Sequence, residues 1–64
     1  MSRVNAQKTG QLIRQQRTAI GMTQGKLADE LNVTNKAISK WENGDGLPDI
    51  SILIQLAAKL HITT

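Results

Sequence analysis

The chain has 64 residues, a formal net charge of +3 and no cysteine, which excludes disulfides and thiolate metal sites. It contains one histidine, no cluster of carboxylates and no glycine loop of the kind that cradles phosphate, so an enzyme, a cofactor and a metal are all disfavoured. The charge favours a polyanionic partner only weakly, because many small domains are equally basic. Since the sequence contains no signal peptide and no membrane-spanning stretch, we expect one small domain in the cytoplasm without membrane contact.

The chain is predicted to begin with a tail and an amphipathic helix. Residues 1–5 form a flexible N-terminal tail, and residues 6–64 form the domain. The helix begins at Ala6 or Thr9 and ends at Ala19. It is indicated by one stripe at three- and four-residue spacing, made of Leu12, Ile13, Gln16 and Ile20.

A second helix is predicted from its N-cap, Thr23, to Leu31, with Leu27, Ala28 and Leu31 on its buried edge. Two residues in its first turn break local rules. Gly25 costs up to about 1 kcal/mol relative to alanine, and Lys26 places a cation where the helix dipole favours an anion. Two interpretations stay open: this end of the helix faces a phosphate, or it is a weakly formed, solvated turn. Asn32 tolerates positive φ and suits a tight bend after the helix.

A third helix, capped by Thr34 and ending at residues 43–44, has two sharply different faces. At about 100° per residue, one face carries Ala37, Ile38 and Trp41, and the other carries Asn35, Lys36, Ser39 and Lys40. The second face offers amides, a hydroxyl and amines, with no carboxylate, and therefore suits the major groove of DNA. Because of its neighbours, we expect Trp41 to lie in the core and not to stack on a base.

A turn at residues 43–46 leads to a fourth helix from Ile50 to Leu60. Its expected buried stripe consists of Ile50, Leu53, Leu56, Ala57 and Leu60. Ile52 and Ile54 are the residues we expect to be left as uncovered apolar surface.

Ordered motifs run along the chain from Gly10 onward: Gly10-x-x-Ile13-x-x-x-Arg17, Met22-Thr23-Gln24-x-x-Leu27-Ala28, Val33-Thr34-x-x-x-Ile38-Ser39-x-Trp41-Glu42-x-Gly44, and Pro48 with Leu53-x-x-Leu56-Ala57-x-x-Leu60. This set resembles the phage repressor and Cro type (XRE-like) of helix-turn-helix domain. The resemblance implies an all-α fold, a compact lambda-repressor-like bundle of four short helices whose second and third form the helix-turn-helix. The family usually has a fifth helix, which is expected to be missing or truncated here.

The resemblance also implies a function: sequence-specific binding of double-stranded DNA by a prokaryotic or phage transcriptional regulator. The recognition helix, about residues 34–43, lies in the major groove, and the full-length protein binds operators as a homodimer. If the missing segment carried the dimer contact, this chain alone is a monomer.

Site residues follow from the family positions. Base edges are contacted by Asn35, Lys36 and Lys40, with Thr34 and Ser39 alongside; phosphates are contacted by Gln24, Lys26 and Asn43; a partly buried salt bridge joins Arg17 to Glu42. Chemistry leaves one alternative open, because either lysine of the recognition helix can hold a phosphate instead of a guanine.

A protein-interaction module is the alternative function, such as an antitoxin-like partner that docks through the apolar fourth helix. RNA binding is less favoured, because the absence of Phe and Tyr removes the usual stacking platforms. Arg3 and His61 are expected to be ordinary terminal residues with no part in a site.

Overall fold

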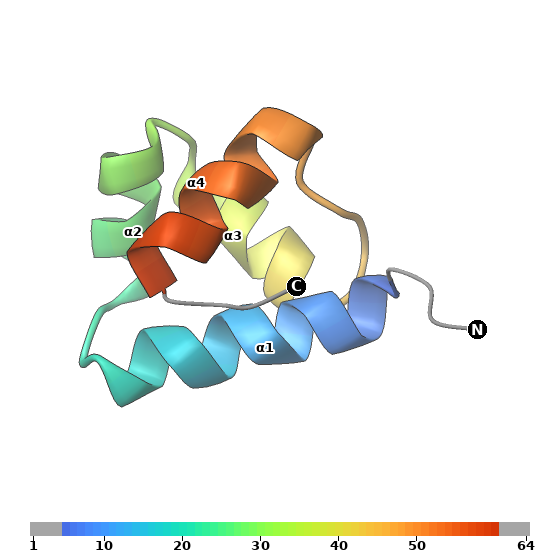
Figure 1. Cartoon of the computed structure of the whole chain (residues 1–64), viewed down its shortest axis with the longest axis horizontal. Helices are drawn as coiled ribbons and strands as arrows, with labels where there is room; N and C mark the ends of the chain where they lie inside the picture. Colours follow the sequence, from blue (N-terminus) through green and yellow to red (C-terminus); the bar gives the residue numbers. More distant parts are fainter. Residues whose placement is uncertain (1–4, 61–64) are drawn as a thin grey trace.

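Four helices follow one another in the computed structural model, which describes residues 5–60: α1 (Ala6–Ala19), α2 (Gln24–Leu31), α3 (Asn35–Glu42) and α4 (Ile50–Leu60). These residues contain no strand, and the predicted all-α bundle is confirmed. Figure 1 shows α1 running along one side of the molecule, with the three shorter helices on its other side. Arg3 and His61 lie outside the described residues, as does most of the predicted tail.

A short polar side chain fixes where each of the four helices begins, and Asn5 does so for α1. Asn5 is the N-cap of α1, and its Oδ1 accepts hydrogen bonds from the backbone N–H groups of Gln7 at 2.9 Å and Lys8 at 3.2 Å. These bonds satisfy helix donors that otherwise have no partner. Asn5 therefore caps the first helix, and α1 begins at the earlier of the two predicted positions.

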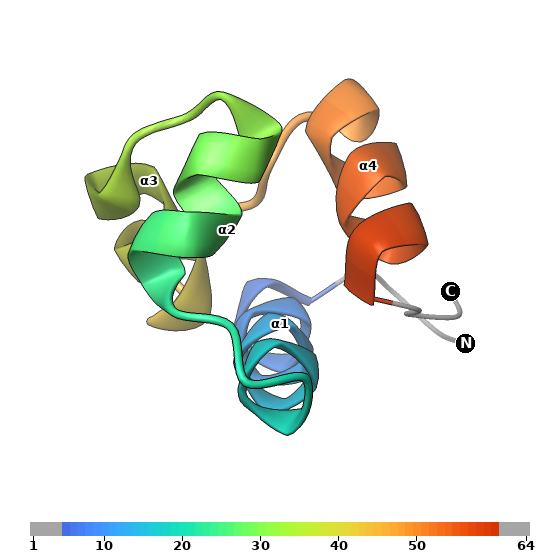
Figure 2. The ribbon, with the colours of Figure 1, turned by 90° about the vertical axis from the view of Figure 1, so that its left-hand side faces the viewer.

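The predicted N-caps of α2 and α3 are present, and so is the predicted bend between the two helices. Thr23 Oγ1 accepts from the backbone N–H of Lys26 at 3.1 Å, and Thr34 Oγ1 accepts from that of Ala37 at 3.1 Å. Between the two helices, Asn32 takes the left-handed conformation, with φ 58° and ψ 42°. The backbone therefore reverses without a glycine, and α2 and α3 pack against each other (Figure 2).

The core draws side chains from all four helices. Its buried members are Ile13 of α1, Leu27, Ala28 and Leu31 of α2, Ile38 of α3, and Leu56 and Leu60 of α4. Trp41 is partly buried and packs against this cluster, as do Met22 and Val33, so its predicted place in the core is confirmed. Aliphatic side chains supply the rest of the core.

The buried face of α4 differs from the predicted one. Ile50 was expected to be buried but is 73% exposed, and Ile52 was expected to be uncovered but packs against the core. Leu56 and Leu60, spaced by four, set the contact face, and Ile52 continues that row one turn earlier. Ile50 starts the helix about 120° away from Leu56. The exposure expected for Ile54 is confirmed, at 64%.

The end of α1 shows a similar difference. Ile20, assigned to the buried stripe, is the C-cap of α1 and is 46% exposed. The helix has ended at this point, so the three- and four-residue spacing no longer keeps a side chain on the core side.

A glycine lets α1 cross α3 at short range. A Cβ atom built at Gly10 would lie 2.9 Å from the carbonyl oxygen of Glu42 and closer still to that of Trp41. Real side chains do not approach backbone so closely, and only glycine fits here. The crossing places the C-terminal end of α3 directly on α1.

Candidate DNA interface

The polar face of α3 is presented to solvent. Asn35, Lys36 and Lys40 are exposed and Ser39 is half-buried, whereas Ile38 on the opposite face is completely buried. Glu42, the single acidic residue of α3, is buried at the far end of the helix. The exposed face is therefore free of carboxylates and rich in hydrogen-bond donors.

Thr34 stands at the N-terminal end of this face. Its hydroxyl oxygen accepts the capping bond from Ala37, while the side chain itself is exposed. A hydroxyl that accepts one hydrogen bond can still donate its own proton. Capping α3 and contacting a ligand are therefore compatible roles for this residue.

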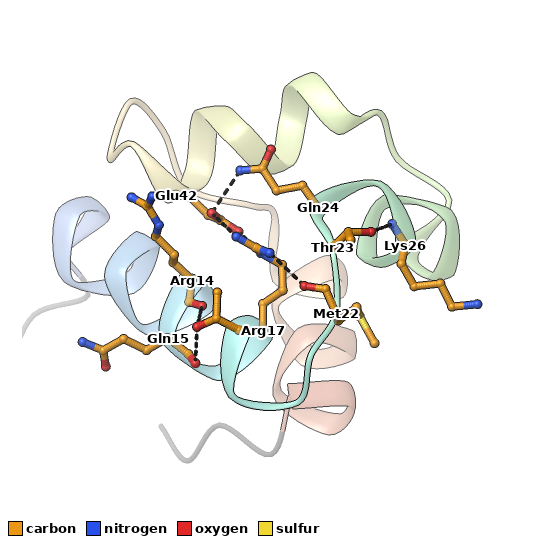
Figure 3. A network of polar contacts seen from close by, with 9 residues as sticks. Arg14, Gln15, Arg17, Met22, Thr23, Gln24, Lys26 and Glu42 are labelled. Atoms are coloured by element: carbon orange, nitrogen blue, oxygen red, sulfur yellow. Dashed lines mark hydrogen bonds and ion pairs between the residues drawn. The ribbon is translucent and has the colours of Figure 1, made fainter.

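Arg17 and Glu42 are joined across the α1–α3 crossing, as Figure 3 shows. Arg17 Nε lies 2.7 Å from Glu42 Oε2, and Nη2 donates to Oε1 at 3.1 Å, so the pair is bidentate. Arg17 Nη1 also donates to the backbone carbonyl of Met22 at 2.8 Å, which ties the end of α1 to the segment before α2. With side chains only 11% and 2% exposed, this ion pair is shielded from water and holds α3 in a fixed orientation.

Gln24 joins the same network from α2. Its Nε2 donates to Glu42 Oε1 at 3.0 Å, so one amide hydrogen is committed to the fold and the other remains for a ligand. Gln24 is also the first residue of α2, where backbone N–H groups have no partner within the helix. The predicted phosphate contact therefore lies beside the buried ion pair, a link that the sequence analysis did not foresee.

Lys26 lies apart from this network, and its side chain extends away from Glu42 in Figure 3. Its side chain is 64% exposed, with Nζ 3.9 Å from Glu30 Oε2 one turn along α2. Glu30 also pairs with Lys59 of α4 at 3.3 Å. An exposed pair at this distance is weak, so the amine of Lys26 is free to exchange Glu30 for another anion.

Asn43 and Lys40 lie where α3 runs into the following loop. Asn43 is the C-cap of α3, and its side chain is exposed. The stem of Lys40 passes close to Gly46, since a Cβ built there would lie 3.1 Å from Lys40 Cε. Lys40 therefore leans toward the loop, whereas Asn35 and Lys36 occupy the opposite, N-terminal end of α3.

Two further residues with structural roles, Gly10 and Asp49, carry recognisable signals in the sequence. A glycine inside a helix is costly, so Gly10 signals a close backbone approach. Asp49 precedes an apolar run and caps α4, with its Oδ1 accepting from the Ile52 N–H at 3.0 Å and the Ser51 hydroxyl at 2.8 Å. The hydrogen bond from the Ile52 backbone, followed by that from Ser51, lowers the pKa of the Asp49 carboxyl.

Two short helices joined by a tight bend, the second with an exposed polar face and the first with its N-terminus beside it, define a helix-turn-helix protein. Residues 13–64 match the family described as helix-turn-helix (HTH_3), and the chain belongs to this family. Such domains bind DNA in transcriptional regulators. No helix within residues 5–60 has the length and apolar character needed to cross a membrane.

Two curated relatives are transcriptional regulators. The cryptic phage CTXphi transcriptional repressor RstR of Vibrio cholerae serotype O1 is 40% identical over 48 residues, 75% of this chain and 43% of that protein. The HTH-type transcriptional activator BcrR of Enterococcus faecalis is 46% identical over 51 residues, 80% of this chain and 25% of that protein. The chain thus spans less than half the length of either relative.

Solved structures share the fold. The restriction-modification controller protein C.AhdI from Aeromonas hydrophila matches with a TM-score of 0.81 and 29% identity, over 91% of this chain and 88% of that one. A structure of Fe(II)-HppE with an alternative substrate matches with a TM-score of 0.81 and 24% identity, over 94% of this chain and 31% of that one. The second likeness concerns the fold alone.

Proposed function

We propose that this chain is the sequence-reading part of a non-enzymatic prokaryotic or phage transcriptional regulator, which binds double-stranded DNA with α3 in the major groove. The observation that carries the proposal is the exposed, carboxylate-free face of α3, held outward by a buried Ile38 and a buried Arg17–Glu42 pair. The relatives' printed roles as repressor and activator support transcriptional regulation.

Within the groove, the N-terminal end of α3 reads base edges. Residues at this end of a recognition helix contact bases in helix-turn-helix complexes. Asn35 pairs with adenine, and Lys36 donates to guanine O6 and N7. Thr34 and Ser39 flank them, and Lys40 contacts the groove at the other end of the helix.

The flanks of the same surface hold phosphates. Gln24, with its free amide hydrogen and the unpaired N–H groups of the first turn of α2, binds one strand. Lys26 adds charge at that end, and Asn43 contacts backbone beyond the C-terminus of α3. These contacts set the register of α3 in the groove without carrying sequence information.

The regulator acts on DNA as a homodimer. Helix-turn-helix dimers place two recognition helices one helical turn of DNA apart. Exposed Ile50 and Ile54 leave apolar surface on α4 within the described part of the chain. The same surface suits the alternative of a docked protein partner, which the experiment below distinguishes.

Amide chemical shifts recorded while a random-sequence duplex is added, at low and then moderate salt, test the proposal without knowledge of the operator. We expect perturbations at residues 24–26, 34–40 and 43 that fade as salt rises. Shifts absent at every ratio, or centred on residues 50–60, would overturn the DNA-binding proposal. The second pattern would favour docking through α4.

A further inference from the structure

One side of α1 packs against the C-terminal end of α3. A Cβ at Gly44 would lie 3.2 Å from Gln7 Cα, Gly10 meets the carbonyls of Trp41 and Glu42, and Arg17 pairs with Glu42. Gln7, Gly10, Arg14 and Arg17 are spaced by three, four and three residues, so they share one side of the helix. Arg14 therefore belongs to the row that lines the end of α3.

Arg14 carries a charge that its surroundings do not neutralise. It is exposed, and within residues 5–60 no carboxylate lies at ion-pair distance from it. Both oxygens of Glu42 are already occupied by Arg17 and Gln24. The whole of α1 contains no acidic residue.

The direction of the side chain places this charge beside the proposed interface. Figure 3 shows Arg14 extending from α1 toward the end of α3 that carries Glu42. Asn43, a proposed phosphate contact, is the next residue after Glu42 and is exposed at the same end. We therefore expect a DNA strand that passes Asn43 to come within reach of the Arg14 side chain.

We infer that Arg14 is a further phosphate contact, which extends the DNA-binding surface from the helix-turn-helix onto α1. The inference rests on the proposed DNA binding and assigns this helix a part in it. A guanidinium suits the role, because its planar donors match two phosphate oxygens. Arg14 contributes affinity and salt dependence equally on every sequence, since a phosphate carries no base information.

A purely structural role predicts something different. The C-terminal end of a helix favours nearby cations, so Arg14 could serve only to stabilise α3. In that case its replacement lowers the melting temperature and leaves the salt dependence of binding unchanged. The slope of log K against log salt therefore separates the two roles.

The experiment measures fluorescence anisotropy of a labelled random-sequence duplex with the 64-residue chain over a series of salt concentrations. The variants are Arg14→Gln, Arg14→Lys and, as matched control, Lys8→Gln. Lys8 is also exposed on α1 but points about 120° away from Arg14. Each glutamine variant removes one positive charge from the same helix.

For Arg14→Gln we expect the magnitude of the salt slope to fall by about 0.9 and affinity at 0.1 M salt to fall by up to about eightfold. Arg14→Lys keeps the slope, and Lys8→Gln leaves both quantities close to wild type. If wild type binds but Arg14→Gln and Lys8→Gln behave alike, the inference about Arg14 is overturned and the proposed function stands. If wild type does not bind the duplex, the proposed function fails and the inference fails with it.

Discussion

At the scale of single residues, the Arg17–Glu42 pair decides how firmly α3 is held. Arg17 donates two hydrogen bonds to Glu42 in a site almost closed to water. Removing one partner strands a buried charge, which costs about 3–5 kcal/mol, whereas replacing both by apolar residues is often nearly neutral. Breaking the pair therefore lowers the free energy of unfolding by more than the intact pair adds to it.

A double-mutant cycle tests this account. We expect Arg17→Met and Glu42→Leu each to lower the free energy of unfolding by about 3 kcal/mol, and the double variant to lose much less than their sum. Urea denaturation of the four proteins gives the coupling energy. Additive effects would mean that the two residues do not interact in solution.

At Lys40, a substitution should change the affinity for DNA with little effect on the stability of the fold. The Lys40 side chain is exposed, and its stem passes close to Gly46. Lys40→Ala should weaken DNA binding while changing the free energy of unfolding by less than about 0.5 kcal/mol. Binding to a panel of duplexes shows which contact was lost: a uniform loss indicates phosphate, and a changed base preference indicates a base edge. A marked loss of helicity would contradict the exposed-face assignment.

At the scale of helices, two glycines test how α1 packs against α3. Gly10 is crowded by the backbone of α3, whereas Gly25 has open space around it. Gly10→Ala should destabilise the fold by about 1–3 kcal/mol, because the new methyl meets the carbonyls of Trp41 and Glu42. Gly25→Ala should instead stabilise α2 by up to about 1 kcal/mol, since the nearest atom to its Cβ is Thr23 Oγ1 at 4.0 Å. Thermal melting of both variants measures the contrast. Equal changes of the same sign would refute the close crossing of α1 and α3.

The cap of α4 gives a pH-dependent contribution to stability. Hydrogen bonds from the Ile52 backbone and Ser51 lower the Asp49 pKa below its ordinary value of 3.8. Folding therefore favours the ionised carboxyl, and this stabilisation is present above about pH 4 and lost as the pH falls through the lowered pKa. Asp49→Ala should lower the melting temperature at neutral pH. Asp49→Asn, which still caps, should flatten the pH dependence of melting; an unchanged profile would exclude this contribution.

Local signals predicted the ends of the helices, and the family positions predicted the Arg17–Glu42 pair, whereas other contacts between helices could not be predicted from the sequence. Thr23, Thr34 and Asn32 act on backbone atoms within a few positions, so their roles follow from residue type and spacing. In α4, apolar residues occupy more than one face, and only packing against the other helices selects Ile52 over Ile50. The Gln24–Glu42 bond likewise depends on the angle between α2 and α3, which no local pattern encodes.

At the scale of the whole molecule, the dimensions of the chain suit two copies on one face of DNA. Its principal extents are 34, 21 and 19 Å, and successive major-groove faces recur every ~34 Å along the duplex. Two copies centred one turn apart therefore fit side by side when either of the two shorter axes, 21 or 19 Å, lies along the duplex. Contact between them requires surface away from α3, and exposed Ile50 and Ile54 provide apolar area for it.

The proposed homodimer makes binding depend on the spacing of two half-sites. Once an operator is selected, inserting about 5 base pairs between its halves turns one half-site to the opposite side of the duplex. For the homodimer we expect this insertion to abolish cooperative binding, while an insertion of about 10 base pairs restores the shared face. Band-shift titrations on the three duplexes measure the change. Equal affinity at all spacings would show that each copy binds alone, and the exposed face of α4 would then be free for a different protein.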